Sequence, residues 1–153
     1  NISSMTAALG FDYPASVEEV IRDVKYKRET LAALRRFKDA DPWKGSFIRR
    51  LGKFTQLHQD LCSIYGVDVE LLVDPSILEN SHSGRSNYNP ALNAITLHGR
   101  LSVLTFLHEW GHVLKGYSEY EACVWSVNLF RRVFPDNFDR LRNNARGHML
   151  VAG

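Results

Sequence analysis

The spacing of apolar residues divides the first part of the chain into two helices. A capping-box pattern at Ser16 precedes an apolar series at helical spacing, which predicts a helix over residues 16–38. Asp41 and Pro42 suit an N-cap and a first helical position, and the apolar series that follows them is typical of a second helix. Gly66 is expected to end this second helix.

Strand patterns follow the two helices. Residues 67–73 alternate apolar and polar side chains at first and predict a strand. Residues 85–88 and 94–98 flank the turn-forming stretch 89–93, which contains proline and two asparagines, and this arrangement predicts a β-hairpin. Together the three strands predict a small antiparallel sheet.

The last third of the chain is helical by the same criterion. Residues 101–115 contain no proline and are apolar in most directions around a helix, so we expect a helix that is buried nearly all round. A second helix is predicted over 118–133 and a short last helix over 137–146. The pattern predicts an α+β fold in one domain over 1–153, with N-terminal helices in 1–66, the sheet and a helix pair in 67–134, and a C-terminal helix and tail in 135–153.

The helix over 101–115 contains His108-Glu109-Trp110-Gly111-His112, an H-E-x-x-H sequence. Residues four apart lie one above the other on a helix, so both imidazoles project from one face and can bind one metal ion. Two His and a Glu in a buried helix are costly unless they are paired or bind a metal. The pattern predicts a zinc site with His108 and His112 as ligands and Glu109 as catalytic base; a polar stripe facing solvent is the alternative. Gly111 is expected to let a neighbouring backbone approach closely.

A catalytic zinc site needs a third protein ligand in addition to water. A chain reversal after the motif helix would bring the first turn of the next helix near the two His. We predict Glu121 as the third ligand, although Ser118-x-x-Glu121 is also a capping box in which Glu121 would bind backbone instead. Glu119 is the alternative if the register differs, and Cys123 and His148 are further candidates.

The hairpin strand 93–97, the segment 105–112 with its H-E-x-G-H sequence, and Glu119-Tyr120-Glu121-Ala122 together resemble the zincin-type metallopeptidases. The resemblance is closest to the ImmA/IrrE-like group, and it covers roughly residues 84–134. It implies a zincin-like fold in which the H-E-x-x-H helix packs against the following helix. It also implies metal ligation by His108, His112 and Glu121, with Glu109 as general base. The implied activity is zinc-dependent hydrolysis of peptide bonds in a protein or peptide substrate.

Such chemistry needs a place for an extended peptide. The strand 93–97 is the last of the predicted sheet, so we expect a free edge at which Ala94, Ile95 and Thr96 bind substrate through backbone hydrogen bonds. An edge that is covered by the N-terminal arm, or guarded against aggregation, is the alternative. Tyr117 and Tyr120 are candidate hydrogen-bond donors to the developing oxyanion.

Composition and charge limit the class of protein, the partners and the compartment that the sequence suggests. Hydrophobic content of 44% and charged content of 24% are ordinary for a soluble globular protein, and a net charge of +2 gives no general reason to expect nucleic-acid binding. Eleven Lys and Arg against six Asp and Glu lie between Ser16 and Lys53, either as solvated helix faces or as a surface for an acidic partner or nucleic acid. No apolar run is long enough for a membrane span, and Cys62 and Cys123 are expected as reduced thiols, which favours a cytoplasmic protein.

Three function classes fit these observations. The first is a zinc endopeptidase, the second is a zincin-fold sensor or regulatory module without general proteolytic activity, and the third is a structural zinc domain. Glu109 favours the first class, since a structural site does not need an acidic side chain beside its ligand. The sequence does not define the substrate or the oligomeric state.

Overall fold

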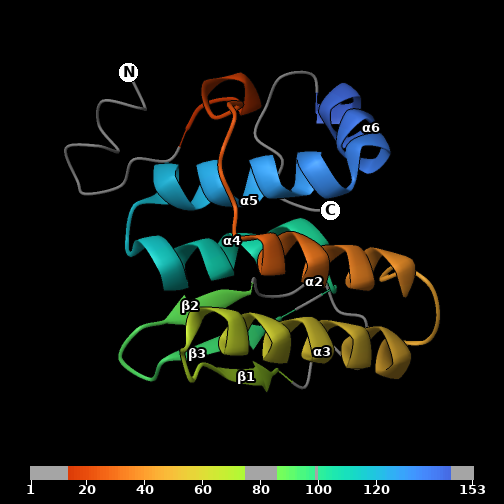
Figure 1. Ribbon diagram of the computed structural model, residues 1–153, viewed down its shortest axis with the longest axis vertical. Helices are drawn as coiled ribbons and strands as arrows, with labels where there is room; N and C mark the ends of the chain where they lie inside the picture. Colours follow the sequence, from red (N-terminus) through yellow and green to blue (C-terminus); the bar gives the residue numbers. More distant parts are fainter. Residues whose placement is uncertain (1–13, 75–85, 99, 146–153) are drawn as a thin grey trace. The chain divides into compact units, whose positions relative to one another are not determined.

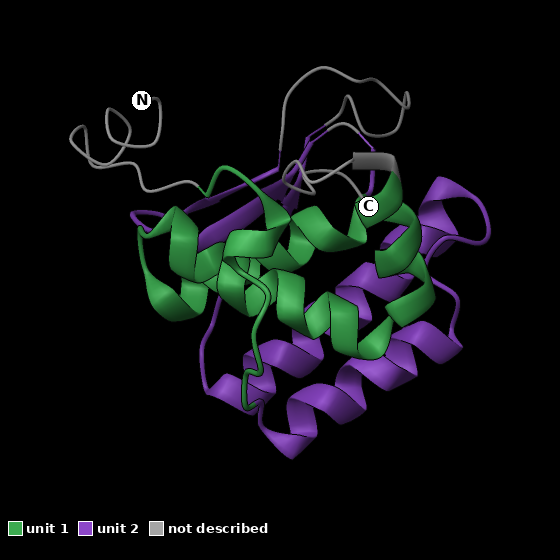
Figure 2. Ribbon diagram, turned by 90° about the horizontal axis from the view of Figure 1, so that it is seen from above, with its two compact units in different colours: residues 1–25, 102–153 green, residues 26–101 purple. Residues whose placement is uncertain are grey.

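The computed structural model describes residues 14–74, 86–98 and 100–145, and these form two compact units. One unit combines the described residues up to Lys25 with those from Ser102 onward, and the other spans Tyr26–Leu101 (Figure 2). The described chain contains α-helices, a short 3-10 helix and a three-stranded sheet (Figure 1), which confirms the predicted α+β class. No helix among the described residues is long and apolar enough to cross a membrane.

The unit 26–101 contains two helices and the sheet. Helix α2 spans Arg28–Asp39 and helix α3 spans Phe47–Tyr65, and the two pack against each other. Helix α3 ends as predicted at Gly66, which adopts a left-handed conformation with φ 63°. The start of α3 differs from the prediction: Ser46 is its N-cap, and the Ser46 hydroxyl accepts a hydrogen bond from the Arg49 backbone N–H.

The predicted cap failed because Asp41 belongs to the turn that follows α2. Asp41 has a positive φ of 57°, outside the extended conformation of an N-cap. The Lys53 ammonium group holds this turn by donating to the carbonyl oxygens of Asp41 and Lys44, at 2.7 and 2.8 Å. The chain therefore needs a few more residues before it enters the second helix.

The sheet is mixed, not antiparallel as predicted. Strand β1 spans Glu70–Val73, β2 spans Asn87–Asn89 and β3 spans Ala94–Leu97. The predicted hairpin is confirmed, since β2 pairs antiparallel with β3, but β3 also pairs parallel with β1 and lies at the centre in the order β1-β3-β2. Because β3 is hydrogen-bonded on both sides, the predicted free edge at Ala94, Ile95 and Thr96 does not exist. Ala94 and Ile95 are buried and belong to the core.

The second unit contains the segment 17–19 as a 3-10 helix, η1 (Val17–Glu19), together with α4 (Val103–Lys115), α5 (Glu119–Val133) and α6 (Pro135–Ala145). The predicted bounds of α4 and α5 agree closely with the structure. Helix α4 is buried on most sides, as its apolar pattern predicts, and its largest fully buried side chain is Trp110.

The single helix predicted over 16–38 is wrong. The structure has η1, then an irregular segment, and α2 begins only at Arg28. The reason is Asn128 on α5, whose buried side-chain amide donates to the Val20 carbonyl and accepts from the Arg22 backbone N–H. These tertiary hydrogen bonds satisfy backbone groups that a continuous helix would otherwise pair.

Gly111 allows α4 and α5 to approach closely, as the sequence predicts. A Cβ atom at position 111 would lie 2.8 Å from the Ala122 carbonyl oxygen and 2.9 Å from the Ala122 Cα, both of them backbone atoms that cannot rotate away. The absence of a side chain at 111 therefore sets the spacing of the two helices that carry the candidate metal centre.

We expect Gly111→Ala to destabilise the protein by about 2 kcal/mol or more, because the new methyl group overlaps backbone. Gly52→Ala on α3 is the matched control. A Cβ at position 52 would meet no atom within 4 Å, so the higher helix propensity of Ala should stabilise the fold by up to about 1 kcal/mol. Urea titrations of both variants would measure these opposite effects; equal destabilisation by both would contradict the packing argument.

Candidate metal centre

Helices α4 and α5 bring together three side chains that can bind one metal ion. His108 and His112 lie on α4 and Glu119 begins α5, and their donor atoms all lie within 4.8 Å of one another. The His108 Nε2 is 2.9 Å from one Glu119 carboxylate oxygen, and the His112 Nε2 is 3.0 Å from the other. Both imidazoles therefore present Nε2 toward the same carboxylate, an arrangement that could hold a metal ion.

The second nitrogen of each ring is oriented by a neighbouring group. The His112 Nδ1–H donates to the Gly116 carbonyl oxygen at 2.8 Å, and the His108 Nδ1 lies 3.6 Å from the Cys123 sulfur. A proton held on Nδ1 leaves the Nε2 lone pair available for a metal, and such outer partners are typical of His ligands in metal sites. The donor set and its orientation fit a divalent metal.

The predicted third ligand, Glu121, is not part of the group of side chains that the structure brings together. Glu119, the stated alternative, completes the group, whereas the Glu121 side chain is exposed and its backbone N–H donates to the Ser118 hydroxyl at 3.1 Å. Ser118 is the N-cap of α5, so Glu119 is the first helical residue. Two residues correspond to about 200° around a helix. A first turn that directs Glu119 toward α4 therefore directs Glu121 away.

Glu109 is buried in the same helix as the two candidate His ligands. Its exposure is 8%, and its negative charge contributes to raising the pKa of His112. The side chains of the group itself are more accessible, with exposures of 16% for His108, 13% for His112 and 26% for Glu119. The centre thus combines a buried carboxylate with a metal-binding group that is open to the surface.

The electrostatics of the centre favour a charged His112 beside a charged Glu119. Burial opposes the charge on His112, but the hydrogen bond to Glu119, helped by the Gly116 carbonyl and the charges of Glu119 and Glu109, raises its pKa to about 8. Burial likewise opposes the charge on Glu119, but hydrogen bonds from His108 and His112 lower its pKa to about 2. In the metal-free protein, a proton on the His112 ring would therefore compete with a metal ion for the same nitrogen.

A metal must displace the proton on His112, so we expect affinity to rise about tenfold per pH unit up to about pH 8 and then to level off. Stability of the metal-free protein should behave differently. The contribution of His112, whose pKa is raised, is lost as pH rises through about 8. That of Glu119, whose pKa is lowered, is lost as pH falls toward about 2. Competition titrations with a chromophoric chelator would measure the affinity; an affinity independent of pH below 8 would contradict this proton competition.

The remaining candidate residues lie away from this chemistry or outside the described residues. The Tyr120 hydroxyl donates to the Glu19 carbonyl oxygen and also contacts Arg22, so it is already engaged with the segment around η1. Tyr117 is 82% exposed. Cys123 contacts His108 without joining the group, and His148 lies outside the described residues, as does Arg85 of the predicted hairpin.

Sequence reasoning missed the two outer partners of the His rings. The Gly116 carbonyl was detectable in principle, because a glycine four residues after His112 ends the helix and leaves a carbonyl near that ring. Cys123 was not detectable in this role, because its contact with His108 depends on how α4 and α5 pack. Comparison of the chain with protein-family models, with curated protein sequences and with solved structures found no match.

Proposed function

We propose that this protein is a zinc-dependent metallopeptidase with a zincin-like arrangement of its metal helix, similar to the ImmA/IrrE-like group. The observation that carries the proposal is the convergence of His108 Nε2 and His112 Nε2 on the Glu119 carboxylate, with Glu109 one residue from the first His. Two His and one Glu is a ligand set of catalytic zinc sites, which keep one position open.

A zinc ion held by His108, His112 and Glu119 would supply Lewis-acid activation of water and of a peptide carbonyl. Glu109 supplies the proton transfer. Its carboxylate oxygen accepts a proton from the water that attacks the carbonyl carbon, and later delivers this proton to the nitrogen of the departing amine. The water oxygen forms a new bond to the carbonyl carbon, and the C–N bond then breaks. The products are a carboxylic acid and an amine, so water is the only co-reactant.

The chain's own groups prepare this reaction in two ways. The Gly116 carbonyl holds the His112 ring in the tautomer whose Nε2 can bind a metal. Glu109 is buried, so its carboxylate is largely shielded from bulk water, and its negative charge acts on the His112 ring. A structural site would require neither a buried acid at this position nor surface access to the ligands.

We expect protein purified without chelator to contain about one zinc per chain and to cleave a library of quenched fluorescent peptides. Chelation should abolish cleavage and lower the melting temperature, and added zinc should restore both, because a metal that binds only the folded state stabilises it. His112→Ala is the control that should neither bind zinc nor respond to chelator.

Two results would contradict parts of the proposal. Cleavage that persists in chelated protein and in His112→Ala would exclude metal catalysis. Stoichiometric zinc without cleavage of the library would favour the alternative of a zincin-fold sensor or regulatory module, in which the metal stabilises a binding surface.

A further inference from the structure

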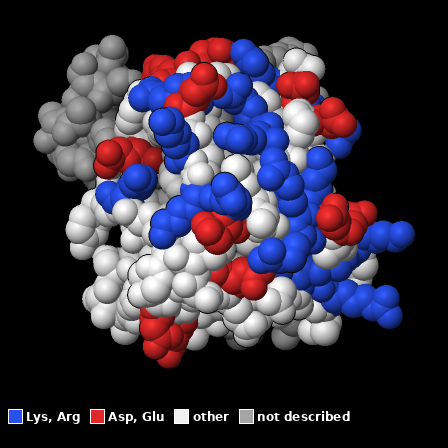
Figure 3. Space-filling view, viewed as in Figure 1, with Lys and Arg blue, Asp and Glu red and all other residues white. Residues whose placement is uncertain are grey.

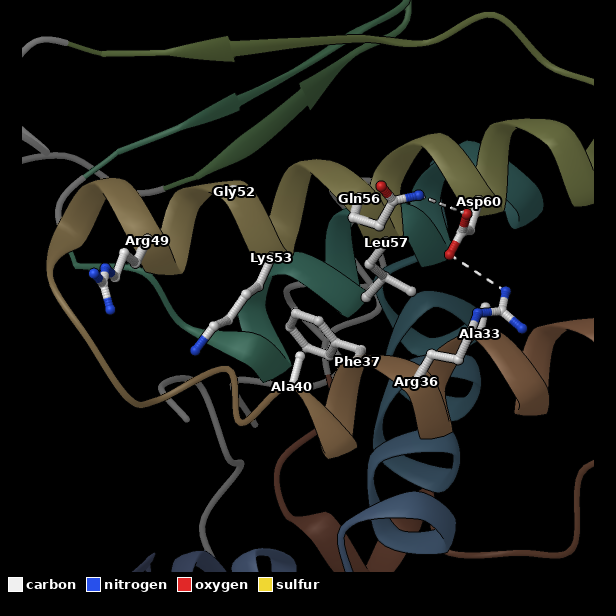
Figure 4. Close-up of a pocket in the computed structure, with 10 residues that line it drawn as sticks. All are labelled: Ala33, Arg36, Phe37, Ala40, Arg49, Gly52, Lys53, Gln56, Leu57 and Asp60. Carbon is white, nitrogen blue, oxygen red and sulfur yellow. Dashed lines mark hydrogen bonds and ion pairs between the residues drawn. The ribbon is translucent and has the colours of Figure 1, made fainter.

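A groove lies between α2 and α3 in the unit 26–101 and belongs to no part of the metal centre. Its volume is about 430 Å³. Phe37 and Leu57 are buried at its base, and Figure 4 shows their side chains between the two helices. The remaining lining residues are Ala33, Arg36, Ala40, Arg49, Gly52, Lys53, Gln56 and Asp60.

The charges in this groove are unevenly distributed. Arg36 pairs with Asp60 at 3.3 Å, and Asp60 also accepts from Gln56, so this end is polar but balanced (Figure 4). The other end carries Arg49 and Lys53, one turn apart on α3. Figure 3 shows Lys and Arg side chains gathered near the turn that joins α2 to α3. One end of the groove is therefore basic.

Lys53 contributes a fixed positive charge to the basic end. Its ammonium group donates to two backbone carbonyl oxygens, of Asp41 and Lys44, and these neutral acceptors hold the group without cancelling its charge. Arg49 is an exposed side chain at the same end. A negatively charged ligand would therefore be attracted to this end of the groove.

Gly52 indicates that the groove is kept open. It lies inside a 19-residue helix, where glycine is unfavourable, and a Cβ there would meet nothing within 4 Å. No packing within the described protein therefore requires glycine at this position, in contrast to Gly111. A missing side chain on the wall of an apolar groove provides room for another molecule.

We infer that this groove is a docking site for an acidic amphipathic helix of a protein partner, independent of the metal centre. The apolar face of that helix would lie over Ala40 and Gly52, which are exposed on the two walls, and Arg49 with Lys53 would face its acidic residues. Half of the lining residues are exposed, so the groove is shallow. A shallow groove suits a helix, whose own backbone covers the open side, better than a small molecule that must be enclosed. The apolar positions on the walls distinguish this surface from a site for nucleic acid, whose affinity comes mostly from basic side chains that contact phosphates.

The test uses the full chain and a fluorescent helical peptide with Leu on one face and Glu on the other. Binding is followed by fluorescence anisotropy. Two comparison peptides replace either all Glu by Lys or all Leu by Ser, and a labelled single-stranded RNA serves as a polyanion without an apolar face. The first peptide should bind, and each replacement should weaken binding by about tenfold or more.

Variants locate the binding on the protein. Gly52→Leu should fill the groove and weaken peptide binding by about tenfold or more, whereas Gln59→Leu, an exposed α3 position outside the groove, should not. Arg49→Gln should weaken binding about threefold and reduce its dependence on salt, whereas Arg35→Gln on α2 should not. Circular dichroism of each variant confirms that the fold is retained.

The inference about the groove can be tested independently of the proposed metal centre. Peptide binding should survive chelation and His112→Ala, so a failed metallopeptidase assay leaves this inference standing. No binding of the acidic peptide, equal binding of the acidic and basic peptides, tighter binding of the RNA, or full binding by Gly52→Leu would each overturn it.

Discussion

Glu119→Ala should reduce metal affinity by on the order of a hundredfold or more, whereas Glu121→Ala should leave the affinity nearly unchanged. Loss of an outer partner alone commonly costs ten- to a hundredfold, so loss of a direct ligand should cost at least as much. Glu119 contacts both His rings, whereas the exposed Glu121 contributes its backbone N–H to the Ser118 cap.

The two variants form a matched pair within one helical turn. Each removes one carboxylate from the first turn of α5, so each loses a similar favourable interaction with the positive end of the helix dipole. A difference in metal affinity between them therefore reports ligation rather than a general loss of negative charge. Isothermal titration with zinc would measure it. Loss of zinc by Glu121→Ala together with retention by Glu119→Ala would restore the ligand set that the sequence resemblance implies.

Local sequence patterns correctly predicted the features that depend on residues close together in the chain. The bounds of α4, the N-cap role of Ser118, the hairpin and the close approach at Gly111 all follow from periodicity, capping or the lack of a side chain. The pairing of His108 with His112 is of the same kind, since four residues bring two side chains together on any α-helix.

The features that escaped prediction depend on residues far apart in the chain. The Asn128 side chain forms hydrogen bonds with the backbone groups of Val20 and Arg22, so the chain is irregular there instead of helical. The parallel pairing of β1 with β3 likewise involves strands separated by the whole hairpin, and no local pattern distinguishes a central strand from an edge strand of this length.

The third member of the candidate metal-binding group was predicted only in part. The sequence identified the correct turn of α5 and both of its acidic residues, but the choice between them required the rotation of α5 relative to α4. The two helices meet backbone to backbone at Gly111 and Ala122, and no local pattern in the sequence gives their relative rotation. The resemblance to the ImmA/IrrE-like pattern favoured the Glu directly before Ala122, whereas the structure groups Glu119 with His108 and His112.

Glu109→Gln should abolish peptide hydrolysis, lowering its rate by about a hundredfold to ten-thousandfold, while zinc content stays at about one per chain. The amide keeps the size and shape of a side chain that is 8% exposed, so the packing of α4 should be preserved. It cannot accept the proton of the attacking water, however, and proton transfer by a positioned carboxylate is worth rate factors of this size.

The electrostatic effect of Glu109 on the candidate metal centre can be measured without a substrate. Its negative charge helps to raise the pKa of His112, so in metal-free Glu109→Gln the pKa of His112 should lie below the wild-type value of about 8, as measured by NMR titration of the ring proton. Glu121→Gln is the matched control, because its exposed side chain lies outside the group. A Glu109→Gln variant that cleaves peptides at the wild-type rate would exclude Glu109 as the base. One that also loses zinc would instead make Glu109 part of the metal-binding group.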